Sequence, residues 1–221
     1  MNKVKAASQI PLDLGHAPSF EIEDFIVSGS NQAAAGLVQS WPNWPAKTIA
    51  LVGPASSGKS HLARAWAADV GAVIYTADLT ASELVPGTPV LAENLDAQQR
   101  TDDEIFHLLN WTKEISSNLL ITSRQHPNHW PVSLPDLRSR LATVLVGEIM
   151  QPDDDLLMLL MAKLFSDRQL QVDMPVLAYV VPRIERSFAA VYAFVARVDA
   201  AALAGKRRIS RALAKSCLED A

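Results

Sequence analysis

The sequence has 221 residues, a formal net charge of −4 and 49% hydrophobic residues. This length and composition allow one large globular domain, or one domain with a small lid, that buries a sizeable core. The acidic balance argues against a protein that coats nucleic acid, and the single cysteine, Cys217, excludes an internal disulfide framework. The basic start is not followed by an apolar segment, and the longest apolar run, 156–162, is too short to cross a bilayer. We expect a soluble, cytoplasmic protein with no membrane partner.

The first segment, residues 8–20, carries apolar residues ahead of any helical pattern. Ile10, Leu12 and Leu14 alternate around Pro11, which favours an extended chain. The segment is either a terminal strand or frayed end, or a linear peptide that docks in extended form on the apolar pockets of a partner.

Apolar and β-branched runs then alternate with helical patterns. Such alternation predicts an α/β domain with a parallel sheet flanked by helices. We expect helices over 30–41, with Ser30 as N-cap, over 60–70 and over 102–116, and strands over 48–52, 72–78, 89–94, 118–123 and 144–149.

From about residue 153 the pattern changes to helical spacing without strand signals. Four helical segments cover 153–168, 174–184, 187–204 and 209–220. We therefore expect three regions: a flexible tail over 1–17, an α/β subdomain over 18–150 and an all-α lid subdomain over 151–221.

The motif GPASSGKS, residues 53–60, is the strongest chemical signal in the chain. It matches G-x-x-x-x-G-K-[ST], and it lies between a predicted strand and a predicted helix, as a phosphate-binding loop does. Gly53 and Gly58 allow backbone N–H groups to face phosphate oxygens, Lys59 supplies a point charge, and Ser60 is a ligand for Mg²⁺. We predict nucleotide binding here, with ADP or ATP and Mg²⁺ as cofactors, by Gly53, Pro54, Ala55, Ser56, Ser57, Gly58, Lys59, Ser60 and His61.

Two residues follow the predicted strand 89–94, where a second acidic element belongs. Glu93 is a candidate for the magnesium site together with Ser60, although it could be an ordinary solvated carboxylate. Asn94 stands where hydrolytic P-loop enzymes commonly place a second carboxylate. An amide cannot act as a base, so we expect weak or no intrinsic ATPase activity.

Three arginines are candidates for contacts with phosphate. Arg138 and Arg140 lie in LPDLRSRL, and Arg186 begins a lid helix. An arginine at a domain edge can stabilise the transition state at a neighbour's γ-phosphate. Taken singly, each arginine is as well explained by a surface ion pair. The polar residues of ITS, 121–123, are weaker candidates.

Together these segments resemble the AAA+ ATPases, and within them the replication-initiator group. The segment 23–35 is similar to that family's first segment, which implies that Phe25 and Ile26 flank the adenine. Residues 134–141 resemble box VII, which places the trans-acting arginine finger on Arg140, and Arg186 corresponds to the sensor 2 arginine. The resemblance covers residues 18–218.

Two features select a member of this group. Initiators continue into a helix-turn-helix domain, whereas this sequence stops at Ala221, so we expect no DNA-binding domain. The tail residues Gln9, Ile10, Pro11, Leu12 and Leu14 resemble the Q-x-x-L-x-L/F type of clamp-binding motif. The chain thus resembles the Hda-type regulators of the DnaA/Hda family.

This resemblance implies a negative regulator of replication initiation that acts in trans. With ADP in its loop, it would bind the DNA-loaded sliding clamp, the β subunit of DNA polymerase III. It would then present Arg140 to ATP on DnaA, stimulating hydrolysis and inactivating DnaA. A homo-oligomer is a further expectation, since AAA+ domains usually assemble head to tail.

Two alternatives remain open. One is an AAA+ helicase loader that acts on a replicative helicase and single-stranded DNA, for which the basic run 205–215 is the supporting feature. The other is a self-contained P-loop enzyme, such as a small-molecule kinase, in which the tail is structural.

Overall fold

The computed structural model of the chain describes residues 25–76, 85–96, 100–205 and 208–219. The predicted tail over 1–17, with its motif from Gln9 to Leu14, lies outside these residues, as does the end of the predicted strand 72–78.

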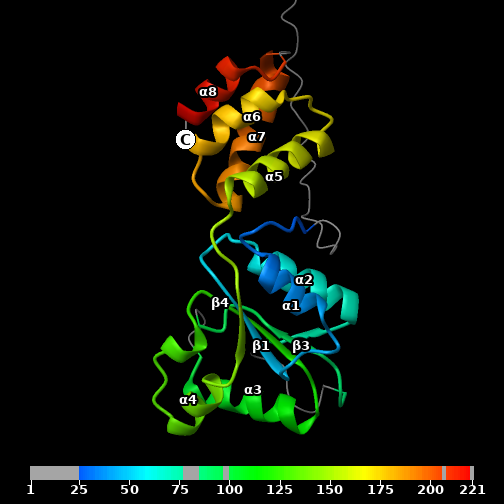
Figure 1. Cartoon of the computed structure of the whole chain (residues 1–221), viewed down its shortest axis with the longest axis vertical. Coiled ribbons are helices and arrows are strands. Elements are labelled where there is room, and N and C mark those ends of the chain that lie inside the picture. The colour runs from blue at the N-terminus through cyan, green and yellow to red at the C-terminus, as the bar shows by residue number, and fades with distance from the viewer. Residues whose placement is uncertain (1–24, 77–84, 97–99, 206–207, 220–221) are drawn as a thin grey trace, which may run out of the picture.

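The described strands form one parallel sheet in the order β2-β3-β4-β1-β5. Helices cover both faces of this sheet, and a group of helices follows it (Figure 1). The predicted fold class, a parallel α/β domain followed by an all-α lid, is therefore confirmed. The strands are β1 Thr48–Val52, β2 Val73–Ile74, β3 Val90–Ala92, β4 Leu119–Ser123 and β5 Leu145–Glu148. The helices are α1 Gln32–Gln39, α2 Lys59–Val70, α3 Asp102–Glu114, α4 Pro135–Leu141, α5 Asp154–Asp167, α6 Met174–Val180, α7 Phe188–Gly205 and α8 Arg211–Glu219, with short 3₁₀ turns η3 Pro127–His129 and η4 Val181–Arg183.

The central strand β1 shows why these strands read as continuous apolar runs. Ile49 and Leu51 pack beneath α1 and α2, whereas Ala50 and Val52 pack against α3 and α4. A strand that is covered on both faces has no polar alternation. The parallel pairing also brings the carboxyl ends of β1, β3, β4 and β5 to one edge of the sheet, where the candidate site lies.

Two local expectations were wrong. The N-cap of α1 is Asn31, not Ser30, because the backbone of Ser30 is bonded to Asp153, which comes much later in the chain. Strand β3 ends at Ala92, before the predicted end at residue 94. Asn94 has a positive φ of 48°, which turns the chain out of the strand and which Asn tolerates better than most residues.

The helices after β5 enclose a second hydrophobic core. Met161, Phe165, Val180, Val195 and Cys217 are among its buried members. Helix α7 is long and apolar enough, by length and composition, to cross a membrane. Its buried side chains belong to this core, however, and it packs against both α5 and α8.

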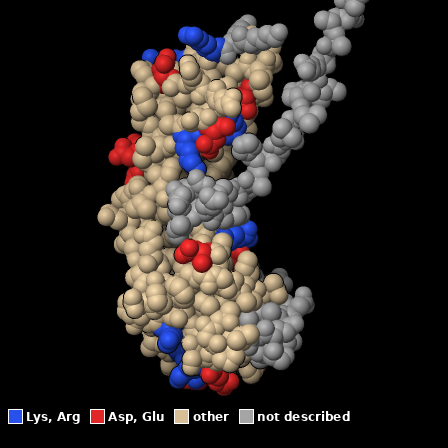
Figure 2. All heavy atoms as spheres, turned by 90° about the vertical axis from the view of Figure 1, so that its right-hand side faces the viewer, with Lys and Arg blue, Asp and Glu red and all other residues tan. Residues whose placement is uncertain are grey.

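The face of the molecule in Figure 2 carries no large patch of charge of one sign. On the face shown in Figure 2, acidic and basic groups lie in small clusters separated by wide uncharged areas. This dispersion agrees with the small net charge of the chain.

Asp153 joins the start of the chain to the start of the helical part. Its Oδ1 accepts a hydrogen bond from the N–H of Leu156 at 2.8 Å and caps α5, while its Oδ2 accepts one from the N–H of Ser30 at 3.2 Å. Burial raises the pKa of Asp153, but hydrogen bonds from Leu156, Ser28 and Ser30 outweigh it and hold the pKa below its usual value. The ionised carboxylate is thus the form that stabilises the fold.

We predict that Asp153→Ala lowers the free energy of unfolding at neutral pH by about 1 kcal/mol or more, because α5 loses its cap. A carboxyl with a depressed folded-state pKa stabilises the fold above its unfolded pKa, and this contribution disappears as the pH falls through the folded pKa. The difference between variant and wild type should therefore narrow below about pH 4. Urea unfolding at several pH values measures it. The control is Asp155→Ala, in the same turn and exposed, which should change little; equal losses would contradict the capping role.

Candidate functional site

The loop between β1 and α2 needs glycine at both ends. A Cβ on Gly53 would lie 2.2 Å from the carbonyl oxygen of Ile149, closer than real contacts allow. Gly58 is the N-cap of α2 and has a φ of 95°, in the left-handed region. The N–H of Gly53 donates to the carbonyl of Ser123 at 3.3 Å, which fixes the start of the loop to β4.

Lys59 lies inside this loop. Its side chain is buried, and its Nζ donates to the carbonyls of Gly53 at 2.7 Å and Pro54 at 2.5 Å. Burial and then the nearby Arg124 lower the pKa of Lys59, and Asp96 partly opposes them. The first turn of α2 has no acidic residue, so its N–H groups and the ammonium form an environment that favours an anion.

Ser57 supplies a second indication of a ligand. Ser57 is only 2% exposed, and its buried Oγ has no hydrogen-bond partner among the described residues. A buried hydroxyl without a partner is costly, and a phosphate oxygen in the loop would provide one.

The helical part touches the loop directly. The N–H of Phe188, the first residue of α7, donates to the carbonyl of Ser56 at 3.2 Å. The Phe188 ring covers Gly58, because a Cβ at Gly58 would lie 2.7 Å from its Cε2. Arg186 is also near this contact in sequence, but its Nη2 pairs with Asp154 of α5 at 2.8 Å and the side chain is half exposed.

Phe25 and His61 meet beside the loop. Their ring centroids are 5.8 Å apart, with a tilt of 43° between the rings. Ile26 packs against the core of the helical part, and its carbonyl accepts a hydrogen bond from the buried amide of Asn31 at 3.0 Å. The segment that was predicted to flank an adenine therefore lies between α2 and the helical part.

Glu93 is held by an arginine that the sequence did not point to. Its Oε2 accepts hydrogen bonds from Nε of Arg64 at 2.9 Å and from Nη2 at 2.8 Å. Oxygen ligands suit Mg²⁺, which binds few protein groups directly and keeps several waters. Arg64 already neutralises Glu93. The residues therefore fit a Mg²⁺ ion that Glu93 would contact through water, with the Ser60 hydroxyl as the second protein oxygen.

Asn94, Thr122 and Ser123 form hydrogen bonds that shape the backbone at this edge of the sheet. Asn94 is exposed, and its N–H donates to Oγ1 of Thr122 at 2.8 Å. The Ser123 hydroxyl donates to the carbonyl of Gln125 at 2.6 Å. Both hydroxyls are therefore engaged in shaping the loops and do not point to a ligand.

Asp96 was missed in the sequence. Its Oδ2 accepts from the N–H groups of Arg124 at 2.7 Å and Gln125 at 2.9 Å, while its buried Oδ1 has no partner among the described residues. It raises the pKa of Lys59 and so lies within electrostatic reach of the ammonium. The only sequence feature that could have pointed to Asp96 is that it is a carboxylate two residues after Asn94.

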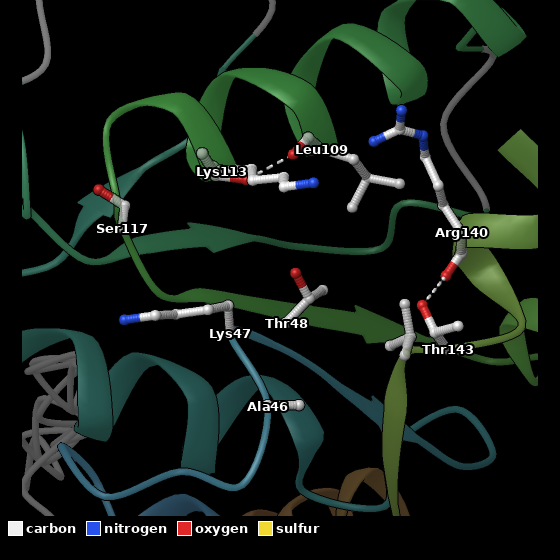
Figure 3. Close-up of a pocket in the computed structure, with 10 residues that line it drawn as sticks. Ala46, Lys47, Thr48, Leu109, Lys113, Ser117, Arg140 and Thr143 are labelled. Carbon is white, nitrogen blue, oxygen red and sulfur yellow. Dashed lines mark hydrogen bonds between the residues drawn. The ribbon is translucent and has the colours of Figure 1, made fainter. Parts of the chain in front are cut away.

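Arg140 lies at the opposite end of the sheet from the loop. It lies in the last turn of α4, shortly before β5, and it lines an open pocket of about 330 Å³ with residues that precede β1 and residues at the end of α3 (Figure 3). Strand β1 separates the two ends by five residues, or about 17 Å. Arg140 is therefore not brought together with the loop of its own chain.

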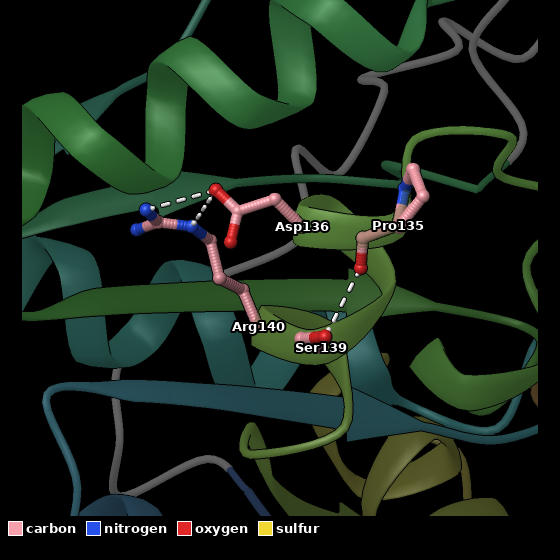
Figure 4. Close-up of polar contacts among 4 residues, drawn as sticks. All are labelled: Pro135, Asp136, Ser139 and Arg140. Carbon is pink, nitrogen blue, oxygen red and sulfur yellow. Dashed lines mark hydrogen bonds and ion pairs between the residues drawn. The ribbon is translucent and has the colours of Figure 1, made fainter.

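The Arg140 guanidinium has a fixed position. Its Nε and Nη2 both donate to Oδ2 of Asp136 at 3.2 Å, one turn earlier in α4 (Figure 4). Its Cζ lies 4.9 Å from the centroid of the Phe106 ring, and the side chain is 33% exposed. Arg138 differs, since its Nη2 donates to the carbonyl of Val132 at 2.7 Å and ties down the preceding loop.

Gly58→Ala should destabilise the protein more than Gly71→Ala, the same change at the left-handed glycine that caps the other end of α2. Gly71, the C-cap of the helix, has a φ of 67° and open space around its Cα, so Gly71→Ala should cost only the backbone term, roughly 1–2 kcal/mol. Gly58→Ala should add about 1–3 kcal/mol, because the Phe188 ring must move. Chemical denaturation of both variants measures the difference, and equal losses would show that Phe188 does not hold the loop.

The comparisons with known proteins fit this geometry. None of the established family models matches the chain. DnaA of Caldanaerobacter subterraneus subsp. tengcongensis, a chromosomal replication initiator protein, is 25% identical over 92% of the chain, and DnaA of a Thermoanaerobacter species is 24% identical over the same share. These matches cover 52% of each relative, so the chain spans about half the length of the curated relatives it matches.

Solved structures show the same fold. Domain III of Thermotoga maritima DnaA superposes with a TM-score of 0.75 at 15% identity, over 92% of this chain and 97% of that one. AMPPCP-bound DnaA of Aquifex aeolicus gives 0.66 at 19% identity, over 83% and 66%. A RuvB variant of Thermotoga maritima gives 0.70 at 14% identity, over 91% and 72%. The chain is therefore homologous to the replication initiator DnaA and has the AAA+ fold of DnaA domain III.

Proposed function

We propose that the chain is an Hda-type regulator that promotes hydrolysis of ATP held by DnaA. In this proposal an adenine nucleotide fills its own loop, the tail binds the DNA-loaded sliding clamp, and Arg140 acts on the partner's nucleotide. The observation that carries the proposal is the position of Arg140, fixed and partly exposed at the end of the sheet away from its own loop.

Nucleotide binding rests on the loop. Lys59 can exchange its carbonyl partners for phosphate oxygens, Ser57 has a free hydroxyl, and the N-terminus of α2 faces the loop. Phe25 and Ile26 would flank the base, with His61 beside Phe25. Mg²⁺, when bound, neutralises phosphate charge, and Ser60 and Glu93 are the protein groups that would hold its water shell. The AMPPCP bound by DnaA of Aquifex aeolicus supports an adenine nucleotide.

The same site supports slow turnover. Asn94 presents an amide where a base is required, and its backbone is held in the left-handed conformation by the bond to Thr122. An adenine nucleotide would therefore remain bound, so that the chain is a stable nucleotide-bound partner and not a rapid ATPase.

Arg140 has the geometry that action in trans requires. Asp136 uses the Nε and Nη2 edge of the guanidinium, while Nη1 makes none of the described hydrogen bonds. The second edge can therefore donate to oxygens of a departing γ-phosphate, where a planar two-pronged cation stabilises the developing charge. Phe106 and Asp136 reduce the entropy that the side chain loses when it engages.

The clamp contact rests on sequence alone. The motif residues Gln9, Ile10, Pro11, Leu12 and Leu14 lie outside the described residues. An extended peptide of this kind would bind through apolar side chains in pockets of the clamp.

ADP should raise the melting temperature of the wild type, because a ligand that binds only the folded state stabilises it by about 2.7 kcal/mol at a hundred times its Kd. Lys59→Ala should lose most of this rise, since the buried cation and its phosphate contacts disappear together. Lys113→Ala, exposed and at the other end of the sheet, is the matched control. Equal shifts in all three proteins would refute the assignment of the loop.

Arg140→Ala should leave ADP binding unchanged and reduce stimulated hydrolysis of DnaA-bound ATP by about 10³-fold. The assay follows labelled ATP on DnaA in the presence of this protein, ADP and DNA-loaded clamp. Arg140→Lys should restore little, because a point charge lacks the planar fork.

Two controls make this assay decisive. Arg138→Ala should retain stimulation, and the combined change Gln9→Ala, Leu12→Ala and Leu14→Ala should lose clamp binding at unchanged thermal stability. Undiminished conversion to ADP with Arg140→Ala would refute the role of Arg140, and capture of a replicative helicase in place of the clamp would favour a helicase loader.

A further inference from the structure

Two arginines of the helical part lie over one tyrosine ring. The Cζ of Arg183, in η4, is 4.1 Å from the centroid of Tyr179, and the Cζ of Arg211, at the start of α8, is 4.2 Å from it. Two guanidiniums whose Cζ atoms both lie this close to the ring centroid fit only on opposite faces of the ring. Tyr179 is thus sandwiched, and the two positive charges are held about 8 Å apart.

This cluster has no acidic partner among the described residues. Neither Arg183 nor Arg211 takes part in any of the described ion pairs, nor does Arg208, which is exposed three residues before Arg211. Four other arginines are paired with carboxylates in the described ion pairs, among them Arg168 with Asp199 at 3.6 Å. We call Tyr179, Arg183, Arg208 and Arg211 the Tyr179 cluster.

The position of Arg211 adds to the concentration of positive charge. It is the first residue of α8, whose first turn contains no acidic residue. A cation at a helix N-terminus opposes the helix dipole, and like charges on the two faces of one ring repel each other. Both unfavourable effects would be reversed by an anion bound at this place.

The cluster is built on fixed elements. Tyr179 packs against the core of the helical part, and its carbonyl accepts a hydrogen bond from Nη1 of Arg183 at 2.8 Å. Ile209, between Arg208 and Arg211, is buried in the same core. The Oγ of Ser210 accepts from the N–H of Leu213 at 3.3 Å. The guanidiniums of Arg183 and Arg211 are therefore presented to solvent with little freedom to lose on binding.

We propose that the Tyr179 cluster binds the phosphate backbone of duplex DNA without reading its sequence. Guanidiniums donate in pairs to phosphate oxygens, so arginine suits this contact better than a point charge does. Both faces of Tyr179 are already covered, so the ring cannot stack on an unpaired base, which is how single strands are usually held. The cluster is thus suited to backbone contacts alone.

Binding through three arginines is weak in isolation, and the net charge of −4 opposes it further. The contact becomes effective when the chain is already held next to DNA, since tethering raises the effective concentration of the site. The tethering rests on the clamp contact of the function proposed above, whereas the cluster itself uses neither the loop nor Arg140, so the two can fail separately.

Fluorescence anisotropy with a labelled duplex at low ionic strength tests the proposal on the full chain. Arg183→Ala combined with Arg211→Ala should weaken binding by about tenfold or more, and should make the slope of log K against log salt less negative by nearly two, about 0.9 for each lost phosphate contact. Duplexes of unrelated sequence should bind alike. Lys215→Ala is the matched control, since it removes an exposed cation from the middle of the same helix, where Lys215 already pairs with Glu219.

Three results would overturn the proposal. The first is an Arg211→Ala variant that binds the duplex as tightly as Lys215→Ala does but melts at a lower temperature than Lys215→Ala. This result would mean that the arginines only hold α6 to α8. The second is tighter binding of a single strand of equal length. The third is competition by polyglutamate at the same charge concentration as effective as that by duplex, which would indicate an acidic protein as the partner.

Discussion

The close approach of Phe188 to Gly58 couples the phosphate-binding loop to the helical part of the molecule. It allows the first residue of α7 to cover the N-cap of α2, and it aligns the Phe188 N–H with the carbonyl of Ser56. Helix α7 also contributes heavily to the core of the helical part. The shape of the loop and the placement of that core are therefore coupled at this glycine, because a side chain at position 58 would force the Phe188 ring to move.

The two cations to which the proposed function assigns roles are held in opposite ways. Lys59 is buried and turned inward, where backbone carbonyls and the more distant Asp96 offset the cost of burial. Arg140 is partly exposed and turned outward, with one edge bonded to Asp136 and the stem against Phe106. The first arrangement suits a group that retains a ligand. The second suits a group that must meet a surface of another molecule without rearrangement.

Local patterns predicted most of the fold. The run TIALV became β1 without error, because a strand covered on both faces is a plain apolar run, and the loop was recognised from its two glycines and its lysine. The spacing of Asp136 and Arg140 is an i,i+4 pair that could have been predicted as well.

Partners distant in sequence could not be predicted in the same way. Ser30 failed as an N-cap because Asp153, 123 residues away, binds its backbone. Glu93 pairs with Arg64, 29 residues earlier, and Asp96 fixes a turn 28 residues later. No periodicity within a single segment records these contacts, because they arise only when the parallel sheet gathers its carboxyl ends.

The separation of the loop from Arg140 along β1 gives the molecule a direction. In the proposed function Arg140 must reach the loop of another molecule. A pair related by a two-fold axis could achieve this only if the loop and Arg140, about 17 Å apart along β1, both lay in the shared patch, and each chain would then both give and receive the arginine. A head-to-tail contact uses the two ends separately and leaves one unmatched surface at each end. In a row of chains of this shape, the molecule at one end offers only its arginine and the molecule at the other end offers only its loop. Which end a newcomer joins therefore decides whether it gives the arginine or receives it.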